Sequence, residues 1–396
     1  MTPKLNKKIF LPLALTVAFV AVFAVGFFVG QNQVVCKVCA PEDLDFSLFW
    51  AAYNKIKNSY IGSEKIDTQE LIYGAIDGMT KSLGDPYTAF FDPNEAKRFE
   101  QDLSGSFEGI GAEVGIKKDQ LTIISPLEGS PAQKAGLKAG DAILKIDGTD
   151  TGNMTTDEAV NLIRGKGGTN VVLTIYREDW GKSQEITITR DTIVIPALEW
   201  EIKNQNIAYV HIYQFDQSLS NDFKKAAMDI LASPAKKIIL DLRGNPGGYL
   251  ETAQEIAGWF LERGQVVTIE DFGEKRKENI YKAEGSAALA EYPLIVLINE
   301  GSASASEILA GALRDNRNVQ LVGQKSFGKG SVQEVQYLPD NSFIKITIAK
   351  WLTPKGSSIS EVGLDPDVKV ELTDKDIEQE KDPQLDKALE IIKTLQ

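Results

Sequence analysis

Three alternating serines stand where an apolar run ends and a helical pattern begins. Residues 299–310 read Asn-Glu-Gly-Ser-Ala-Ser-Ala-Ser-Glu-Ile-Leu-Ala, directly after the strand-like run from Tyr292 to Ile298. A serine at a helix N-terminus lies beside free N–H groups, which favour negative charge. Such a serine could be a nucleophile that forms an oxyanion. It could equally be an ordinary helix cap, since serine is a preferred cap residue.

The composition limits which base could activate a serine. The chain has one histidine, His211, in an alternating strand-like run where we expect a structural role. This scarcity disfavours a Ser-His-Asp triad and a multi-histidine metal site. A lysine can replace the histidine when burial lowers its pKa. Lys329, flanked by glycines, is one candidate and Lys325 in the same loop is another, although Gly-Lys-Gly alone would also suit an exposed turn.

Length and composition indicate a multidomain globular protein. A chain of 396 residues holds roughly two or three domains, and its 43% hydrophobic and 25% charged residues are ordinary. The net charge of −13 argues against a nucleic-acid partner, because phosphate binding needs a basic surface. Cys36 and Cys39 are the only cysteines of the chain. The folded region after them therefore has neither a disulfide framework nor a zinc cluster of cysteines. This pair could form a local disulfide, carry a lipid or have no role.

The N-terminal segment predicts a membrane anchor. Residues 9–30 carry no charge and follow Lys4, Lys7 and Lys8. A helix of this length spans a hydrocarbon core of about 30 Å, and the basic flank should stay in the cytoplasm. The pattern therefore predicts an uncleaved single-pass helix with everything after Gly30 on the extracytoplasmic side, at the periplasm or cell surface. A cleaved signal peptide is the competing interpretation, disfavoured because no small-x-small cleavage site is clear.

Hydrophobic periodicity divides the rest of the chain into segments with different patterns. Helical spacing comes first, then glycine-rich turns with short strands, then alternating strands and helices, and last a charged helical tail for packing or dimerisation. The pattern predicts a multidomain α+β or α/β protein. Its parts are a cytoplasmic basic end (1–8), a transmembrane anchor (9–30), a linker (31–41), a helical region (42–104), a β-rich domain (105–191), an α/β core with additional strands (192–372) and a helical tail (373–396).

The β-rich domain contains the stretch SPAQKAGLKAGDAILKIDG at residues 130–148. With this motif the segment resembles a PDZ domain of the bacterial, protease-associated kind. In PDZ domains a glycine-rich loop binds the C-terminal carboxylate of a peptide through backbone N–H groups, and the peptide adds to the sheet edge as a strand. The matching loop is Gly109, Ile110, Gly111 and Ala112, for which a simple tight turn is the alternative.

The chain after the anchor resembles the C-terminal processing peptidases, also called tail-specific proteases. The resemblance rests on Ser-Ala-Ser-Ala-Ser-Glu at 302–307, Phe-Gly-Lys-Gly at 327–330 and Asp-Leu-Arg-x-Asn-x-Gly-Gly at 241–248. It implies a serine endopeptidase with a Ser-Lys dyad and a PDZ domain. The implied mechanism requires no metal ion and no organic cofactor.

The resemblance also implies roles for individual residues of the dyad. Ser304, three positions before Glu307, matches the nucleophile, and Lys329 matches the general base. Gln333 matches the residue that holds this lysine. Glu307 matches an acidic position close to the dyad. An ionised Glu307 beside Lys329 would raise the pKa of the lysine, so we expect Glu307 to point elsewhere or to bond to Gln333 or to backbone.

Further positions are implied around the dyad. The N–H of Ala305, after the nucleophile, matches one oxyanion-hole donor, and Gly247 or Gly248 supplies the other. Ser302 and Ser306 are interpreted as neighbours that keep the turn small. Arg164 matches a PDZ arginine that in some members contacts the protease core and couples peptide binding to activity.

Together these features predict a membrane-anchored endopeptidase that cleaves exported proteins near or from their C-termini. Its substrates would have apolar C-termini, and a homodimer or a regulatory or adaptor protein stays open. A PDZ-based regulatory or scaffold protein on an inactive protease fold is the alternative, which the intact Ser304, Lys329 and Gln333 disfavour. A serine hydrolase that uses His211 is a third hypothesis, and it would require that strand to point at Ser304.

Overall fold

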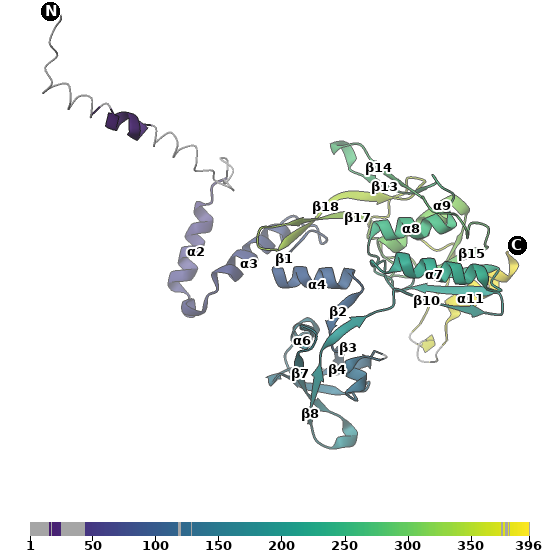
Figure 1. Ribbon diagram of the computed structural model, residues 1–396, viewed down its shortest axis with the longest axis horizontal. Helices are drawn as coiled ribbons and strands as arrows, with labels where there is room; N and C mark the ends of the chain where they lie inside the picture. Colours follow the sequence, from purple (N-terminus) through teal and green to yellow (C-terminus); the bar gives the residue numbers. More distant parts are fainter. Residues whose placement is uncertain are drawn as a thin grey trace, which may run out of the picture. The chain divides into compact units, whose positions relative to one another are not determined.

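The structure of the chain is a computed structural model (Figure 1). It divides into two units, Met1–Ile72 and Tyr73–Gln396, which we describe one at a time. Within the described residues, no helix combines the length and the apolar character that a membrane span needs. Most of the predicted anchor at residues 9–30 lies outside the described residues. The structure describes residues 16, 18–24, 44–117, 120–127, 129–373, 375–376, 379 and 381–395.

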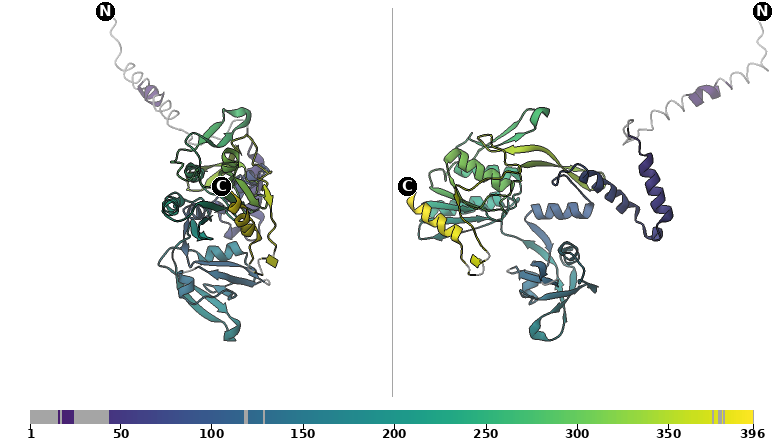
Figure 2. Two further views of the ribbon diagram at one scale, coloured as in Figure 1. Left: turned by 90° about the vertical axis from the view of Figure 1, so that its right-hand side faces the viewer. Right: turned by 180° about the vertical axis from the view of Figure 1, so that it is seen from behind.

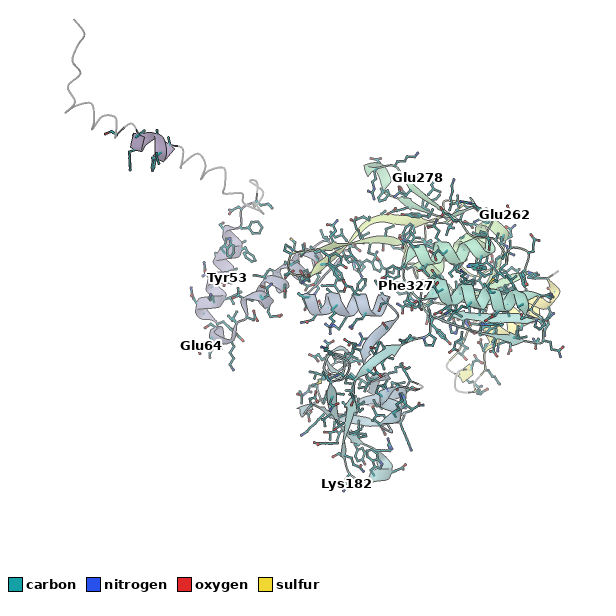
Figure 3. The ribbon with its side chains drawn as sticks, viewed as in Figure 1. Tyr53, Glu64, Lys182, Glu262, Glu278 and Phe327 are labelled. Carbon is teal, nitrogen blue, oxygen red and sulfur yellow. The ribbon has the colours of Figure 1, made fainter. Side chains whose placement is uncertain are left out.

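The first unit contains a helix whose side chains are all at least partly accessible. None of the side chains of α2 is buried, and its consecutive aromatic rings contact one another edge to face. Figure 3 shows Tyr53 on this helix and Glu64 in the turn after it. The helix α3 begins in the first unit and ends in the second. The bounds are α2 (Ser47–Ser59), a 3-10 turn (Ser63–Lys65) and α3 (Thr68–Lys81).

A six-stranded sheet in the order β10-β11-β12-β15-β16-β19 forms the centre of the second unit. β10 is antiparallel to β11, and all other neighbouring strands are parallel. Parallel pairing follows from the alternation of strands and helices along this part of the chain. The strands are β10 (Leu198–Lys203), β11 (Ile207–Ile212), β12 (Lys237–Asp241), β15 (Leu294–Ile298), β16 (Gln320–Gly323) and β19 (Val368–Lys369).

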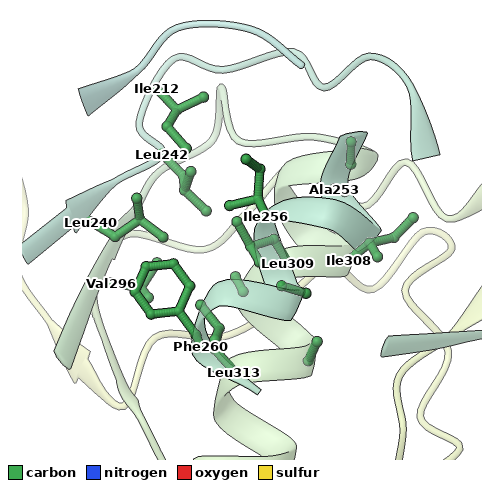
Figure 4. Close-up of a cluster of buried hydrophobic side chains, with 14 of the residues drawn as sticks. Ile212, Leu240, Leu242, Ala253, Ile256, Phe260, Val296, Ile308, Leu309 and Leu313 are labelled. Atoms are coloured by element: carbon green, nitrogen blue, oxygen red, sulfur yellow. The ribbon is translucent and has the colours of Figure 1, made fainter. Parts of the chain in front are cut away.

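Helices cover both faces of this sheet (Figures 1 and 2). In β12, Ile238 and Leu240 belong to the core under α7, α8 and α9, whereas Ile239 belongs to the core under α11. Burial on both faces makes such strands apolar without interruption. Figure 4 shows the larger core where α8 and α9 meet the strands. The helices are α7 (Leu219–Ala232), α8 (Leu250–Phe260), α9 (Ala305–Arg317) and α11 (Pro383–Thr394).

A second sheet takes one strand from residues 42–104, the segment predicted as a helical region. β1 lies in this segment and pairs with β18, which places Phe90 opposite Ile344. Phe91 stacks on Phe343 with 4.6 Å between ring centroids. The sequence pattern did not predict β1, β13 or β14, and both β1 and β13 find their partner β18 far along the chain. The strands are β1 (Ala89–Phe91), β13 (Val266–Asp271), β14 (Asn279–Lys282), β17 (Ser331–Tyr337) and β18 (Phe343–Leu352).

The PDZ-like domain has its own sheet, in the order β3-β4-β5-β7-β8, with β6 paired to β5. Its core includes the fully buried Ile123, Leu173 and Ile175. α6 begins at a capping box in which Thr155 and Glu158 bond each other's backbone N–H. The bounds are β3 (Ala112–Lys117), β4 (Gln120–Pro126), α5 (Pro131–Lys134), β5 (Ala142–Ile146), β6 (Thr149–Asp150), α6 (Thr156–Ile163), β7 (Asn170–Tyr176) and β8 (Gln184–Thr189).

Two strands connect this domain to the rest of the unit. α4 (Pro93–Leu103) leads into β2 (Ser106–Gly109), and β2 pairs with β9 (Asp191–Val194). β9 therefore crosses the predicted domain boundary at residue 191. The chain enters and leaves the domain through this antiparallel pair.

Candidate active site

Ser304 occupies an unusual backbone position between β15 and α9. Its φ is +56° and its ψ is −115°, a region that residues other than glycine rarely adopt. Its N–H donates to Glu307 Oε2 at 2.9 Å, and its carbonyl accepts from the N–H of Ile308 at 2.9 Å. The strained turn is thus fixed from both sides by the first turn of α9, and Ser304 opens that helix.

The two serines on either side of Ser304 make hydrogen bonds that hold the serine turn in place. Ser302 Oγ donates to the carbonyl of Leu242 at 2.8 Å, and Ser306 Oγ donates to the carbonyl of Asn245 at 3.0 Å. Both serine side chains are fully buried. The interpretation that they only keep the turn small was therefore incomplete, because they tie the serine turn to the turn after β12.

That second turn brings glycine backbone against the candidate nucleophile. Gly247 has a φ of +99°, and a Cβ built on it would lie 2.7 Å from the Cβ of Ser304 and 3.0 Å from the N of Ala305. Gly248 has a φ of +145°, and a Cβ there would meet the carbonyl oxygen of Phe215. Only glycine allows this close approach of two turns.

The hydrogen bonds distinguish the two glycines that were predicted for the oxyanion site. The N–H of Gly247 donates to Asn245 Oδ1 at 2.9 Å, and Asn245 Nδ2 donates to the carbonyl of Ile212. In the described part of the chain, the N–H groups of Gly248 and Ala305 make no hydrogen bond. The geometry therefore favours Gly248 over Gly247 as the partner of Ala305, and Asn245 holds the turn in shape.

Lys329 lies in the loop between β16 and β17, and its side chain is half-buried. Burial lowers the pKa of Lys329, and the charge of Glu307 acts in the opposite direction. The alternative base, Lys325, is exposed and lies 3.8 Å from Asp365. Of the two lysines of this loop, Lys329 is thus the one whose surroundings favour a neutral amine.

Glu307 joins the serine turn to the lysine loop. It is fully buried, and its carboxylate accepts from the N–H groups of Ser304, Gly328 and Lys329 at 2.8–3.0 Å and from Ser326 Oγ. Burial raises the pKa of Glu307, and these hydrogen bonds act against that increase. The expectation that Glu307 would bond to backbone agrees with this arrangement, although its charge still reaches Lys329.

The side chains of two other candidates point to different partners. Gln333 Nε2 donates to the carbonyl of Ser331 at 3.0 Å and to its hydroxyl, so its amide holds Ser331 rather than the predicted Lys329. His211 lies with Nε2 at 3.4 Å from the carbonyl of Arg243 and its ring 4.2 Å from that of Tyr213. This placement is consistent with the structural role expected for the histidine.

A cleft of about 560 Å³ brings six of the predicted residues together. It opens where the loop before β17 and the ribbon of β17 and β18 face the beginning of α9 and the turn after β12. The described residues contain no cluster of metal ligands. The predicted residues that line the cleft are Gly247, Gly248, Ser304, Ala305, Lys329 and Gln333.

Three comparisons with known proteins agree with this arrangement. Residues 206–370 match peptidase family S41, residues 122–177 match a PDZ domain, and residues 32–95 match the N-terminal domain of the activating protease CtpB. The carboxy-terminal processing protease CtpA of Bacillus subtilis is 40% identical over 363 residues, which cover 91% of this chain and 77% of that protein. The chain belongs to the carboxy-terminal processing proteases of this family.

Further similar proteins support the membership in this protease family. The carboxy-terminal processing protease CtpB of Bacillus subtilis is 39% identical over 328 residues, which cover 82% of this chain and 67% of that protein. The structure of a photosystem II D1 C-terminal processing protease matches with a TM-score of 0.52 and 27% identity, covering 82% of this chain and 87% of that structure. The predicted family, a serine protease with a PDZ domain, is therefore confirmed.

In the PDZ domain of this protease, the predicted carboxylate loop leads to a free sheet edge. Gly109 ends β2, and the carbonyls of Ile110 and Gly111 accept from the N–H groups of Ala132 and Leu127. β3 then begins at Ala112 and is the outermost strand of its sheet.

Arg164 directly follows α6 and lies beside the predicted carboxylate loop, because a Cβ built on Gly109 would be 3.7 Å from its Cγ. Its guanidinium lies over the ring of Phe107 at 4.6 Å from the centroid. It also lines a pocket of about 360 Å³ together with Lys97 and Arg98 of α4. These neighbours belong to β2 and α4, and the predicted contact of Arg164 with the protease core stays a prediction.

A buried ionic network behind the glycine turn was not predicted from the sequence. Arg243 pairs with Asp241 at 2.6 Å and with Asp382 at 2.8 Å, and Tyr209 Oη donates to Asp241 at 2.7 Å. Burial alone would lower the pKa of Arg243, but the bonds to both carboxylates raise it. The family motif contained Asp241 and Arg243, yet nothing in the tail sequence indicated that Asp382 would reach them.

Proposed function

We propose that this chain is a serine endopeptidase with Ser304 as nucleophile and Lys329 as general base. The observation that carries the proposal is that one cleft is lined by both residues, Ser304 at the start of α9 and the half-buried Lys329. Burial lowers the pKa of Lys329, as a lysine base requires. The free N–H groups of Ala305 and Gly248 beside Ser304 support the same function.

The chemistry follows from these positions. Neutral Lys329 accepts the proton of Ser304 Oγ while this oxygen attacks the carbonyl carbon of the scissile peptide bond. The N–H groups of Ala305 and Gly248 donate to the oxyanion that forms. The protonated Lys329 then donates to the leaving amine. Water, deprotonated by the same lysine, hydrolyses the acyl-enzyme and releases Ser304.

The relatives' names and the PDZ domain support a substrate class. Several similar proteins are named carboxy-terminal processing proteases, which favours protein substrates cleaved near their C-termini. In our proposal the free C-terminus of the substrate docks at residues 109–112, and the preceding residues pair with β3 as an added strand. An apolar terminal side chain would then pack against β3 and α6.

The apolar segment at residues 9–30 supports a location for this activity. We propose that it anchors the chain in a membrane as a single helix, with Lys4, Lys7 and Lys8 on the cytoplasmic side. The protease would then act on exported proteins on the extracytoplasmic side. Protease protection of the full-length chain in intact and in disrupted cells tests this orientation.

Substitution of both dyad residues tests the mechanism. We expect Ser304→Ala and Lys329→Ala to lower kcat for an internally quenched peptide with an apolar C-terminus by on the order of 10³-fold or more. Lys325→Ala is the matched control, because Lys325 lies exposed in the same loop, and it should keep wild-type activity. Equal cleavage by the wild type and both dyad variants would overturn the proposal. Loss in His211→Ala with an active Lys329→Ala would move the base to the histidine.

A further inference from the structure

A second lysine lines the catalytic cleft. Lys345 on β18 faces the same cleft as Ser304 and Lys329, and its side chain is half-buried. Its Nζ lies over the rings of Phe91 and Phe99, at 5.2 and 5.3 Å from their centroids. The face of an aromatic ring attracts a cation, so these rings stabilise a charged ammonium group inside the cleft.

The strand register places Lys345 close to the dyad. In the ribbon of β17 and β18, Val335 lies opposite Lys345 and Gln333 lies opposite Thr347. Alternate residues of a strand share one face, and consecutive pairs on that face are about 7 Å apart. Lys345 therefore shares a face with Gln333, four positions after Lys329 in the chain. The two ammonium groups are close enough for the charge of Lys329 to lower the pKa of Lys345, in addition to the larger effect of burial.

The other charged groups around this pair come from several elements. Asp85 attracts Lys345, and it is itself bonded to Thr88. Glu270 of β13 accepts from Asn279 and Tyr281. Among the described residues, the other carboxylates that line the cleft or contact the dyad are Glu251 of α8, Glu334 of β17 and Glu307 of α9.

Burial lowers the pKa of Lys329, and Glu307 acts against this effect. The charge of Glu307 favours protonated Lys329, which cannot accept a proton from Ser304. A positive charge in the same cleft acts in the opposite direction, by repelling the proton on Lys329. Burial and the charge of Lys329 lower the pKa of Lys345, whereas Asp85 and the two aromatic rings favour its protonated form.

We propose that Lys345 is a positioning residue for the reaction, whose charge keeps Lys329 in the neutral form that accepts the proton of Ser304. This inference rests on the proposed role of Lys329 as the base. It assigns a function to β18 and to the two phenylalanines from residues 89–104, which hold the ammonium group in the cleft.

The pH dependence of kcat/KM separates this role from a structural one. We expect Lys345→Gln and Lys345→Met to move the acid limb of kcat/KM upward by about 0.5–1 pH unit in the full chain, because protonated Lys329 is then less disfavoured. At pH values below the acid limb, kcat/KM of these variants should be about 3- to 10-fold lower than that of the wild type. At pH values above the limb it should stay near the wild-type value. Lys345→Arg keeps the charge and should leave the limb in place.

A matched control removes a charge elsewhere on the same strand. Lys350 lies exposed on β18 outside the cleft, so Lys350→Gln should not move the acid limb. The pH dependence of Ser304 labelling by a fluorophosphonate should show the same shifts as peptide cleavage. Cooperative thermal unfolding of each variant establishes that it is folded.

Several outcomes would overturn the inference. An unmoved acid limb in folded Lys345→Gln or Lys345→Met, with or without a lower plateau, shows that the charge has no effect on Lys329. If neither variant folds, NMR titration of Lys329 in Ser304→Ala/Lys345→Arg decides, and an ordinary lysine pKa near 10.4 would contradict us. An inactive Lys329→Ala together with an unmoved limb rejects only this inference, whereas an active Lys329→Ala rejects the proposed function.

Discussion

Glu307 is the residue on which the geometry of the dyad depends most directly. It is the single acceptor that reaches the backbone of both Ser304 and Lys329 within the described residues. All of its contacts come from N–H or O–H donors, which suits an ionised carboxylate. Its charge works against a neutral lysine, while its hydrogen bonds hold the lysine loop against the serine turn. The same side chain therefore stabilises the position of the lysine loop and disfavours the neutral form of the lysine.

Glu307→Gln separates these two effects. The amide has nearly the same shape but offers one acceptor oxygen, so a backbone N–H of Ser304, Gly328 or Lys329 loses its partner. We expect a loss of about 1–3 kcal/mol in the free energy of unfolding, measured in urea. Loss of the negative charge also lowers the pKa of Lys329, so the acid limb of kcat/KM should move to lower pH, opposite to the shift for Lys345→Gln. A limb that moved upward would contradict the electrostatic argument.

Several residues of the site could be predicted from the sequence, and others could not. Ser304, Lys329 and the glycine turn stand in motifs, because the backbone geometry at each allows few residue types. Asn245, Ser302 and Ser306 gave a weaker signal, since their role depends on hydrogen bonds between two turns that meet only in the folded chain. Asn245 lies within the motif at residues 241–248. The motif did not show that Asn245 accepts from the N–H of Gly247, which leaves the N–H of Gly248 as the candidate donor to the oxyanion.

At the scale of elements, burial decides what a sequence can reveal. β12 and β15 are covered on both faces, so their unbroken apolar runs predict strands directly. β13 and β14 form a partly exposed hairpin with mixed polarity, and β13 is paired to β18 by tertiary contacts. The tail helix α11 was predicted from its spacing. Its contact with Arg243 through Asp382 depends on a charge pair that periodicity cannot show.

Asp382→Asn tests how strongly α11 is held to the sheet. Asn can still cap α11 at the N–H of Leu385, but it loses the ion pair with Arg243. Burial raises the pKa of Asp382, and the stronger effect of Arg243 and backbone N–H groups lowers it overall. Because the folded pKa lies below the unfolded one, this stabilisation is present above about pH 4 and is lost as pH falls through the folded pKa.

We expect Asp382→Asn to lower the free energy of unfolding by about 1–2 kcal/mol at pH 7, allowing for partial solvent screening. The difference from the wild type should shrink near pH 3. Asp386→Asn is the control, because Asp386 lies exposed in the first turn of the same helix and should change little. A difference that stayed constant between pH 7 and pH 3 would show that the charge of Asp382 is not what holds α11.

At the scale of the whole molecule, the PDZ domain and the catalytic cleft belong to one polypeptide unit but have separate hydrophobic cores. β2 and β9 connect them, and α4 carries Phe99 and Leu103 to the cleft just before the chain enters the PDZ domain. The order of these parts could be predicted from the sequence, because each has its own motif. The sequence did not predict that α4 both lines the cleft and leads into the PDZ domain, since α4 was predicted only as a polar helix.

The role of the PDZ domain in substrate selection can be tested with one pair of peptides and one pair of glycines. A peptide with a free C-terminus should be cleaved with a kcat/KM at least about 10-fold above that of its amidated form, because amidation removes the carboxylate that the loop would bind. Gly111→Ala should abolish this preference, since its Cβ would lie 2.5 Å from that of Ser130 at a φ of +70°. Gly129→Ala shares the positive φ, +69°, but meets nothing within 4 Å, so it should keep the preference. Equal cleavage of the free and amidated peptides by the wild type would mean that the PDZ domain does not select substrates by their C-terminal carboxylate.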